Sequence, residues 1–142
     1  MAEAILLLTL FNTKRRKSYL TSRISDLQTY KSLATYAQGD VRSIYAQEKN
    51  EVVSFYKSLY KEDEEYNGKY TDYTEIPEYQ EEIERLSAKM QEELEALDAE
   101  ATQRNQEITV ASAELEELNA YEESWKSMLN SNIQNDFNYA QG

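Results

Sequence analysis

The sequence contains no cysteine and no histidine, and its 142 residues include only three glycines and one proline. The absence of cysteine excludes disulfide bridges and thiolate chemistry. The absence of histidine removes the side chain that most often acts as a general base at neutral pH and as a transition-metal ligand. With so few glycine and proline residues, turns are scarce, and the composition favours long uninterrupted elements.

Motifs that carry chemistry are also missing from the sequence. There is no glycine-rich phosphate loop, no cluster of metal-ligand residues and no nucleophile beside a base. The acidic run Glu62–Glu65 lacks the alternating oxygen ligands and the central glycine of a calcium loop, so we interpret it as solvated charge. We therefore predict no catalytic residues, no cofactor and no metal site, and we expect that the protein is not an enzyme.

Charge is distributed unequally along the chain, whose net charge is −12. Residues 1–61 hold ten basic and five acidic side chains, whereas residues 62–142 hold five basic and 22 acidic ones. Opposite charge favours contact between the two halves, either within one molecule or between molecules. Nucleic acid is excluded as a partner, because phosphate binding requires a basic surface that the chain lacks overall.

Apolar residues recur at alternating spacings of four and three between residues 83 and 129, which predicts a helix with one narrow apolar seam. Ser87, Arg104 and Glu122 are the polar interruptions of this pattern. We expect the seam to contact a partner helix. Its main predicted residues are Leu94, Leu97, Ile108, Leu115 and Leu118.

A second helical pattern covers about residues 18–61, and Gly39 marks a point where that helix could break. Residues 62–76 are predicted to form the connecting loop. Its Asn67-Gly68 pair is a turn signal that fits either an irregular loop or a small β-hairpin. Pro77 suits the start of the second helix, over residues 77–139. The fold class is therefore all-α, a single-domain (1–142) long antiparallel two-helix coiled-coil hairpin with a short apolar N-terminal helical segment. Its predicted register places Lys14–Lys17 near Glu122 and Glu123.

The stretch Ala4–Phe11 is apolar on every side and ends at the basic cluster Lys14–Lys17. It is too short to span a bilayer, which needs about 20 residues, and it does not resemble a cleavable signal peptide. A membrane-surface anchor is an open alternative. We favour burial in an assembly without membrane contact, together with apolar residues late in the chain. The predicted assembly interface is Ile5, Leu6, Leu7, Leu8, Leu10, Phe11, Trp125, Leu129, Ile133 and Phe137.

In outline, a cysteine-free helical hairpin with apolar residues at both ends resembles the leaderless subunits of type III secretion needles and of the flagellar filament core. The helical-hairpin WXG-type secreted proteins are a second analogue. Two segments, Ile76–Glu82 and Asn132–Phe137, are similar to parts of uncharacterised bacterial coiled-coil proteins. The resemblance implies a self-assembling filament subunit, extracellular or at the cell surface, with itself and an export machinery as partners. The alternative is a cytoplasmic coiled-coil adaptor or chaperone that binds a partner helix.

Overall fold

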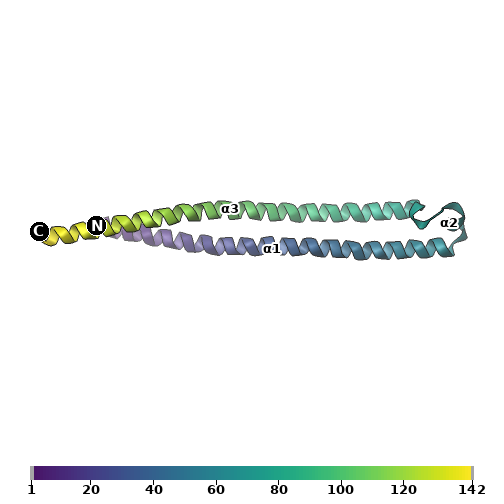
Figure 1. The fold of residues 1–142 in the computed structure, drawn as a ribbon, viewed down its shortest axis with the longest axis horizontal. Coiled ribbons are helices and arrows are strands. Elements are labelled where there is room, and N and C mark those ends of the chain that lie inside the picture. The colour runs from purple at the N-terminus through teal and green to yellow at the C-terminus, as the bar shows by residue number, and fades with distance from the viewer. Residues whose placement is uncertain (1, 142) are drawn as a thin grey trace. The chain divides into compact units, whose positions relative to one another are not determined.

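The computed structural model describes residues 2–141, with side chains for residues 2–140. Its two long helices are α1 (Ala2–Glu62) and α3 (Pro77–Gln141), and between them lie a short helix α2 (Glu64–Lys69) and a 3-10 turn η1 (Tyr73–Glu75) (Figure 1). No strand occurs among the described residues. The predicted all-α, two-helix hairpin is confirmed.

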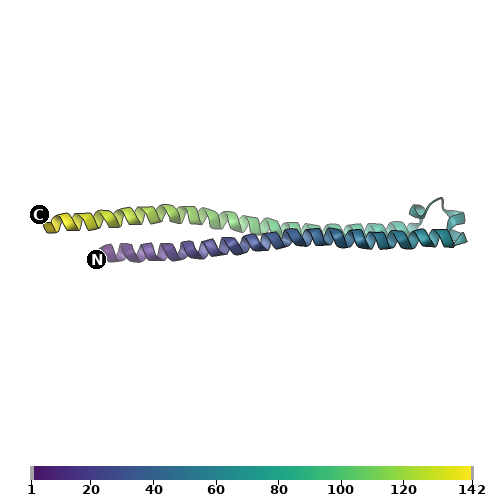
Figure 2. The same ribbon diagram turned by 60° about the horizontal axis from the view of Figure 1, so that its bottom comes forward.

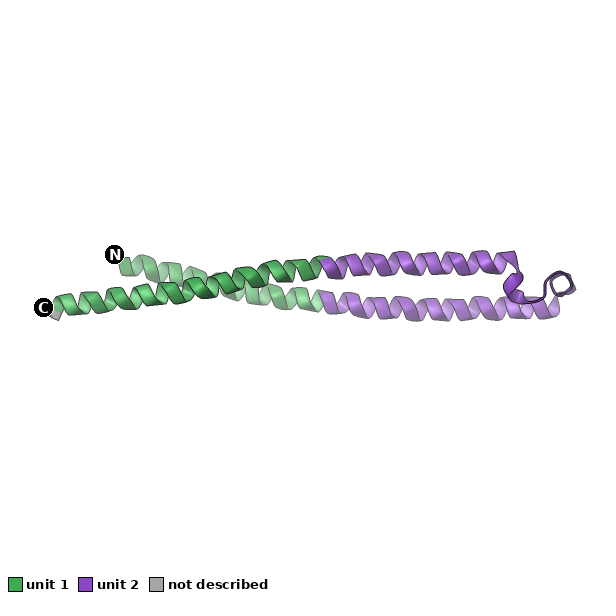
Figure 3. Ribbon diagram, turned by 45° about the horizontal axis from the view of Figure 1, so that its top comes forward, with its two compact units in different colours: residues 1–30, 103–142 green, residues 31–102 purple. Residues whose placement is uncertain are grey.

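The chain divides into two compact units (Figure 3). Unit 1 combines the beginning of α1, up to Tyr30, with α3 from Gln103 onward, and unit 2 comprises Lys31–Thr102. In unit 2 the end of α1 and the beginning of α3 run side by side in opposite directions, as the views in Figures 1 and 2 both show. In unit 1 the antiparallel direction follows from the ion pairs, because Lys17 pairs with Glu122 and Arg23 with Glu107.

The seam of unit 1 follows the heptad pattern of the sequence on both helices. On α1 the buried side chains are Leu10, Thr13, Leu20 and Leu27, which is only 1% exposed, and Ala111 is their apolar counterpart on α3. Most other seam positions are only half-buried, because each helix has a single neighbour to cover it. The predicted seam residues Ile108, Leu115 and Leu118 are half-buried here, and Leu94 and Leu97 are half-buried in unit 2.

Tyrosines stabilise the end of unit 2 where the chain turns from α1 to α3. The Tyr60 hydroxyl lies 3.0 Å from the carbonyl oxygen of Tyr70 and 2.8 Å from that of Thr71, so it can donate to either. The Tyr79 ring packs edge-to-face against Tyr56 and Tyr73, with centroids 5.6 and 5.2 Å apart. These contacts attach the connection to both helices. Ile76, which is fully buried, donates its N–H to the Tyr73 carbonyl, and its own carbonyl accepts the Gln80 N–H in the first turn of α3.

Several element boundaries differ from the sequence prediction. The apolar stretch before residue 18 is not a separate helix, because α1 runs unbroken from Ala2 through Gly39 to Glu62. Gly39 costs a helix about 1 kcal/mol relative to alanine, which the packed stripe on both sides of it outweighs. The connection contains no β-hairpin within the described residues. Asn67 and Gly68 lie in α2 because the Asp63 side chain caps that helix by accepting from the Glu65 N–H.

We predict that Leu27→Ala lowers the free energy of unfolding by about 2–5 kcal/mol, because it leaves a cavity at a fully buried seam position. The matched control is Leu33→Ala on the same helix, where the side chain is 57% exposed and the expected change is within about 0.5 kcal/mol. Urea denaturation followed by circular dichroism measures both values. Equal losses in the two variants would contradict the heptad seam.

Candidate functional site

The first turns of α1 expose large apolar side chains in several directions. Ile5 is 66% exposed, Leu7 54%, Leu8 61% and Phe11 58%. Successive residues of an α-helix point about 100° apart, so these four side chains spread over an arc of about 160° on the side of the helix away from the seam. Leu10, in contrast, is buried in the seam. One neighbouring helix therefore leaves most of this apolar surface open to solvent.

The remaining predicted interface residues divide in the same way. Trp125 and Leu129 are half-buried at seam positions of α3, and Leu6 is half-buried on α1. Ile133 and Phe137 are exposed on the last turns of α3. We define the apolar surface of unit 1 as the exposed members of the predicted set: Ile5, Leu7, Leu8, Phe11, Ile133 and Phe137.

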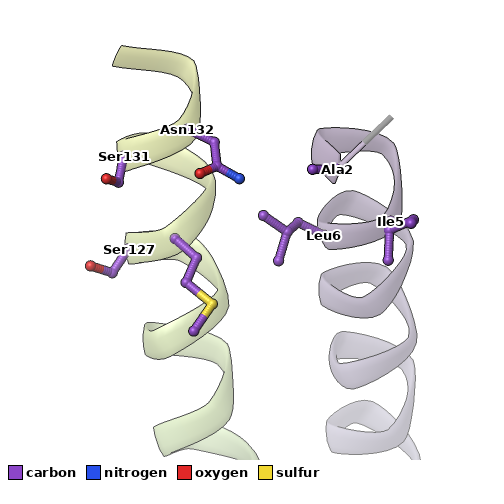
Figure 4. Close-up of a pocket in the computed structure, with 7 residues that line it drawn as sticks. Ala2, Ile5, Leu6, Ser127, Ser131 and Asn132 are labelled. Atoms are coloured by element: carbon purple, nitrogen blue, oxygen red, sulfur yellow. The ribbon is translucent and has the colours of Figure 1, made fainter. Parts of the chain in front are cut away.

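One flank of unit 1 carries two hollows between the helices, and we call it the grooved flank. The larger hollow, of about 570 Å³, is lined by residues such as Ile5 and Met128, and Leu6 and Asn132 point toward the space between the helices (Figure 4). The other, of about 510 Å³, includes Tyr19 and Val110.

Ion pairs connect the two helices along the grooved flank. Arg16 donates two hydrogen bonds to Glu114, at 2.8 and 3.1 Å, and its guanidinium lies 5.0 Å from the centre of the Tyr19 ring. The hydrogen bonds from Arg16 lower the pKa of Glu114. Arg23 lies 3.7 Å from Glu107. These pairs fix the antiparallel alignment of α1 and α3 in unit 1.

A charged group occupies the seam itself. Glu122, which is buried, accepts a hydrogen bond from Lys17 and forms an ion pair with Lys126 at 3.0 Å. The predicted proximity of Lys17 and Glu122 is confirmed. The hydrogen bonds from Lys17 and Lys126 lower the pKa of Glu122 to about 2. The sequence signal for this site was the polar interruption of an apolar pattern, although sequence alone did not assign it a role.

A second carboxylate in the seam has the opposite environment. Glu3 Oε1 is buried without a hydrogen-bond partner, and Asp136 is its neighbour across the seam. A hydrogen bond shared with Asp136 raises the pKa of Glu3, and burial and repulsion between the two carboxylates act in the same direction. The ionised form of Glu3 is therefore disfavoured where the first turns of α1 contact the last turns of α3.

Other kinds of site receive no support in the part of the chain that the structure describes. No group of three or more acidic side chains there is arranged to hold a metal ion. Within the same residues, no helix combines the length and the hydropathy needed to cross a membrane. The apolar surface and the charged seam of unit 1 are thus its candidate functional features.

We predict that acid weakens the hairpin through Glu122. Because the pKa of Glu122 is lowered in the folded state, its stabilising contribution is complete above about pH 4.5 and is lost as the pH falls toward 2. Glu122→Gln should therefore be less stable than the wild type at pH 7, and this difference should shrink between pH 4.5 and 2. Chemical denaturation at each pH measures it, with Glu123→Gln as the exposed control. A constant difference across this range would contradict the ion-pair role.

Glu3 should act in the opposite direction. Its pKa is raised in the folded state, so protonation favours closure of the first turns of α1, and this contribution is lost as the pH rises through the folded pKa. We predict that Glu3→Gln slows amide hydrogen exchange between residues 5 and 13 at pH 7 by about twofold to tenfold, the range of a single surface-type interaction. Asp26→Asn is the control. Faster exchange in Glu3→Gln would show that the carboxylate stabilises this end.

Comparisons of the chain with protein-family models, with curated proteins and with solved structures found no match. The function therefore has to be inferred from the exposure, contacts and charges of its own residues. In unit 1 these are an apolar surface that α1 and α3 do not cover and a seam with charged groups at two levels.

Proposed function

We propose that the protein is a structural protein that self-associates through the apolar surface of unit 1. The observation that carries this proposal is the exposure of Ile5, Leu7, Leu8 and Phe11 within seven consecutive residues of one helix. Fully burying one such side chain stabilises by about 1.5–3 kcal/mol. Several of them buried together supply enough free energy to drive association, whereas exposed apolar patches of this kind are rare on soluble monomers.

The arrangement of these residues supports an open assembly rather than a closed dimer. Ile5, Leu7 and Leu8 point in different directions from α1, so one partner cannot cover all three. Subunits with more than one contact surface form filaments when the contacts do not close into a ring. We therefore propose the finer function of a filament subunit, extracellular or at the cell surface, in line with the resemblance to secretion needles and flagellar filament cores.

The grooved flank supports a second candidate function, an adaptor that binds a partner helix. A groove between two helices can accept the apolar face of an amphipathic third helix. Such a protein would form a one-to-one complex or a closed dimer and would not polymerise. Stoichiometry therefore separates the two proposals.

We predict that the wild type forms assemblies larger than dimers at high concentration and that Leu8→Glu with Phe11→Glu prevents them. Both side chains are exposed, so the hairpin should remain folded. The matched control is Leu33→Glu with Tyr36→Glu, which changes two exposed apolar residues of α1 in unit 2 and should assemble as the wild type does. Sedimentation velocity and negative-stain microscopy measure the assemblies.

The outcomes of this experiment distinguish the filament subunit from the adaptor. Equal loss of assembly in both variants would show that the apolar surface of unit 1 is not the specific interface. A wild type that stays monomeric at all concentrations would overturn self-association. A wild type that stops at a closed dimer would favour the adaptor over the filament.

A further inference from the structure

The flank of unit 1 opposite the grooved flank carries a different set of residues. Arg16 pairs with Glu114 across the grooved flank. In the heptad pattern of α1, Leu7 and Lys14 each follow a seam residue, whereas Arg16 precedes one. Leu7 and Lys14 therefore lie on the side of the seam opposite Arg16. By the same pattern Ile133 of α3 lies there too. Lys126 occupies the same heptad position as Ile133 and pairs with Glu122 of its own chain.

We define the open flank by the positions that follow a seam residue and by exposed residues about one turn from them: Leu7, Phe11 and Lys14 of α1, and Glu116, Glu123, Lys126, Ile133 and Phe137 of α3. The Arg15 guanidinium lies at the edge of this flank, 5.9 Å from the centre of the Phe11 ring.

Charge on this side is separated between the two helices. Between residues 2 and 30, α1 holds five basic and two acidic residues, whereas residues 103–141 of α3 hold two basic and seven acidic ones. The ion pairs between the helices use Arg16, Lys17 and Arg23 on α1. Lys14 and Arg15 form no ion pair with any described residue, and on α3 the same is true of Glu116 and Glu123. Each helix therefore presents unneutralised charge of one sign.

We propose that a second copy of this chain docks on the open flank in parallel, with α1 of each copy beside α3 of the other. This inference rests on the proposed self-association and names its partner surface. In this arrangement a two-fold axis parallel to the helices of unit 1 relates the two copies. Each residue therefore has the same position along this axis in both copies, and we call this position its level. The ion pairs within one chain join residues whose numbers add to between 130 and 139, so Lys14 lies at the level of residues 116–125 of the second copy, which include Glu116 and Glu123. Unpaired basic residues then meet unpaired acidic ones.

The apolar residues match in the same arrangement. Residues of α1 and α3 that pair across unit 1 have numbers that add to between 130 and 139, so Leu7 lies at the level of residues 123–132 of the second copy, and Ile133 follows directly after them. A two-fold axis perpendicular to the helices, centred on these apolar residues, would move Lys14 away from Glu123. The parallel arrangement satisfies apolar and charged residues together. Ile5 and Leu8, which lie outside the open flank, remain available for further contacts.

A charge-exchange experiment tests the docking. Variant A carries Lys14→Glu with Arg15→Glu, and variant B carries Glu116→Lys with Glu123→Lys. Alone, each variant places like charges in both α1–α3 contacts, so its dissociation constant should rise at least tenfold. Mixed in equal amounts, A and B place opposite charges in both contacts and should associate within about threefold of the wild type. Repulsion within one chain is not relieved by mixing, so rescue identifies a contact between chains.

Cysteine cross-linking tests the orientation with neutral substitutions, and the chain has no native cysteine to interfere. A mixture of Lys14→Cys and Glu123→Cys chains should form a heterodimeric disulfide under mild oxidation. The control mixture pairs Lys14→Cys with Glu95→Cys, which occupies the same heptad position as Glu123 four heptads earlier on α3, and should form at least tenfold less.

The outcomes also separate this inference from the proposed function. If the wild type does not self-associate, both fail. If the wild type self-associates but mixing A with B gives no rescue, or the control pair cross-links as well as Lys14→Cys with Glu123→Cys, only the parallel docking on the open flank is overturned. Rescue together with selective cross-linking establishes it.

Discussion

The narrow apolar seam between α1 and α3 is the interaction on which each unit depends. A helix pair can shield only one stripe on each helix, so side chains such as Leu20 and Leu27 are buried while their flanking neighbours stay exposed. Seam positions such as Leu115 and Leu118 remain half-buried because no third helix covers them. Each level of the seam therefore contributes little by itself, and stability has to accumulate over many levels. The same geometry leaves apolar area that a further helix could bury.

Charged residues within the seam of unit 1 have opposite effects at two levels. Glu122 lies between two lysines and is stabilised as a carboxylate, whereas Glu3 meets Asp136 and is destabilised as one. A buried ion pair of the first kind adds little net stability but penalises any other alignment of the helices, because a shifted partner would leave a buried charge unpaired. The second kind disfavours the ionised form of Glu3, and the turns that carry it are those that expose Ile5, Leu7 and Leu8.

A heptad pattern predicts a seam because its spacing fixes which residues share one face of the helix. Spacing alone placed Leu94, Leu97, Ile108, Leu115 and Leu118 on one stripe of α3. In contrast, the stretch from Ala4 to Phe11 is apolar on every side, so its spacing does not show which side faces the partner helix. Which of its residues enter the seam depends on the stripe continuing from Thr13 and Leu20, and this continuity turns Leu6 and Leu10 inward.

The connection between α1 and α3 was the least predictable part of the fold. Its Asn67-Gly68 signal was correct for an isolated turn, but the Asp63 cap incorporated it into α2. The tyrosine contacts at that end join residues far apart in the sequence, such as Tyr60 and Thr71, through a side chain and a backbone carbonyl. No local pattern marks a contact of this kind.

The contacts of the basic cluster Lys14–Lys17 help to decide whether unit 1 suits a membrane surface or a second copy of the chain as its partner. A membrane-surface anchor would need Lys14–Lys17 free to contact anionic headgroups. Arg16 and Lys17 are instead engaged by Glu114 and Glu122, which leaves Lys14 and Arg15. The acidic α3 segment runs beside them and would be repelled by an anionic surface. A partner that offers separate acidic and apolar residues at matching levels suits this flank better than a lipid surface does, and α3 of a second copy provides both.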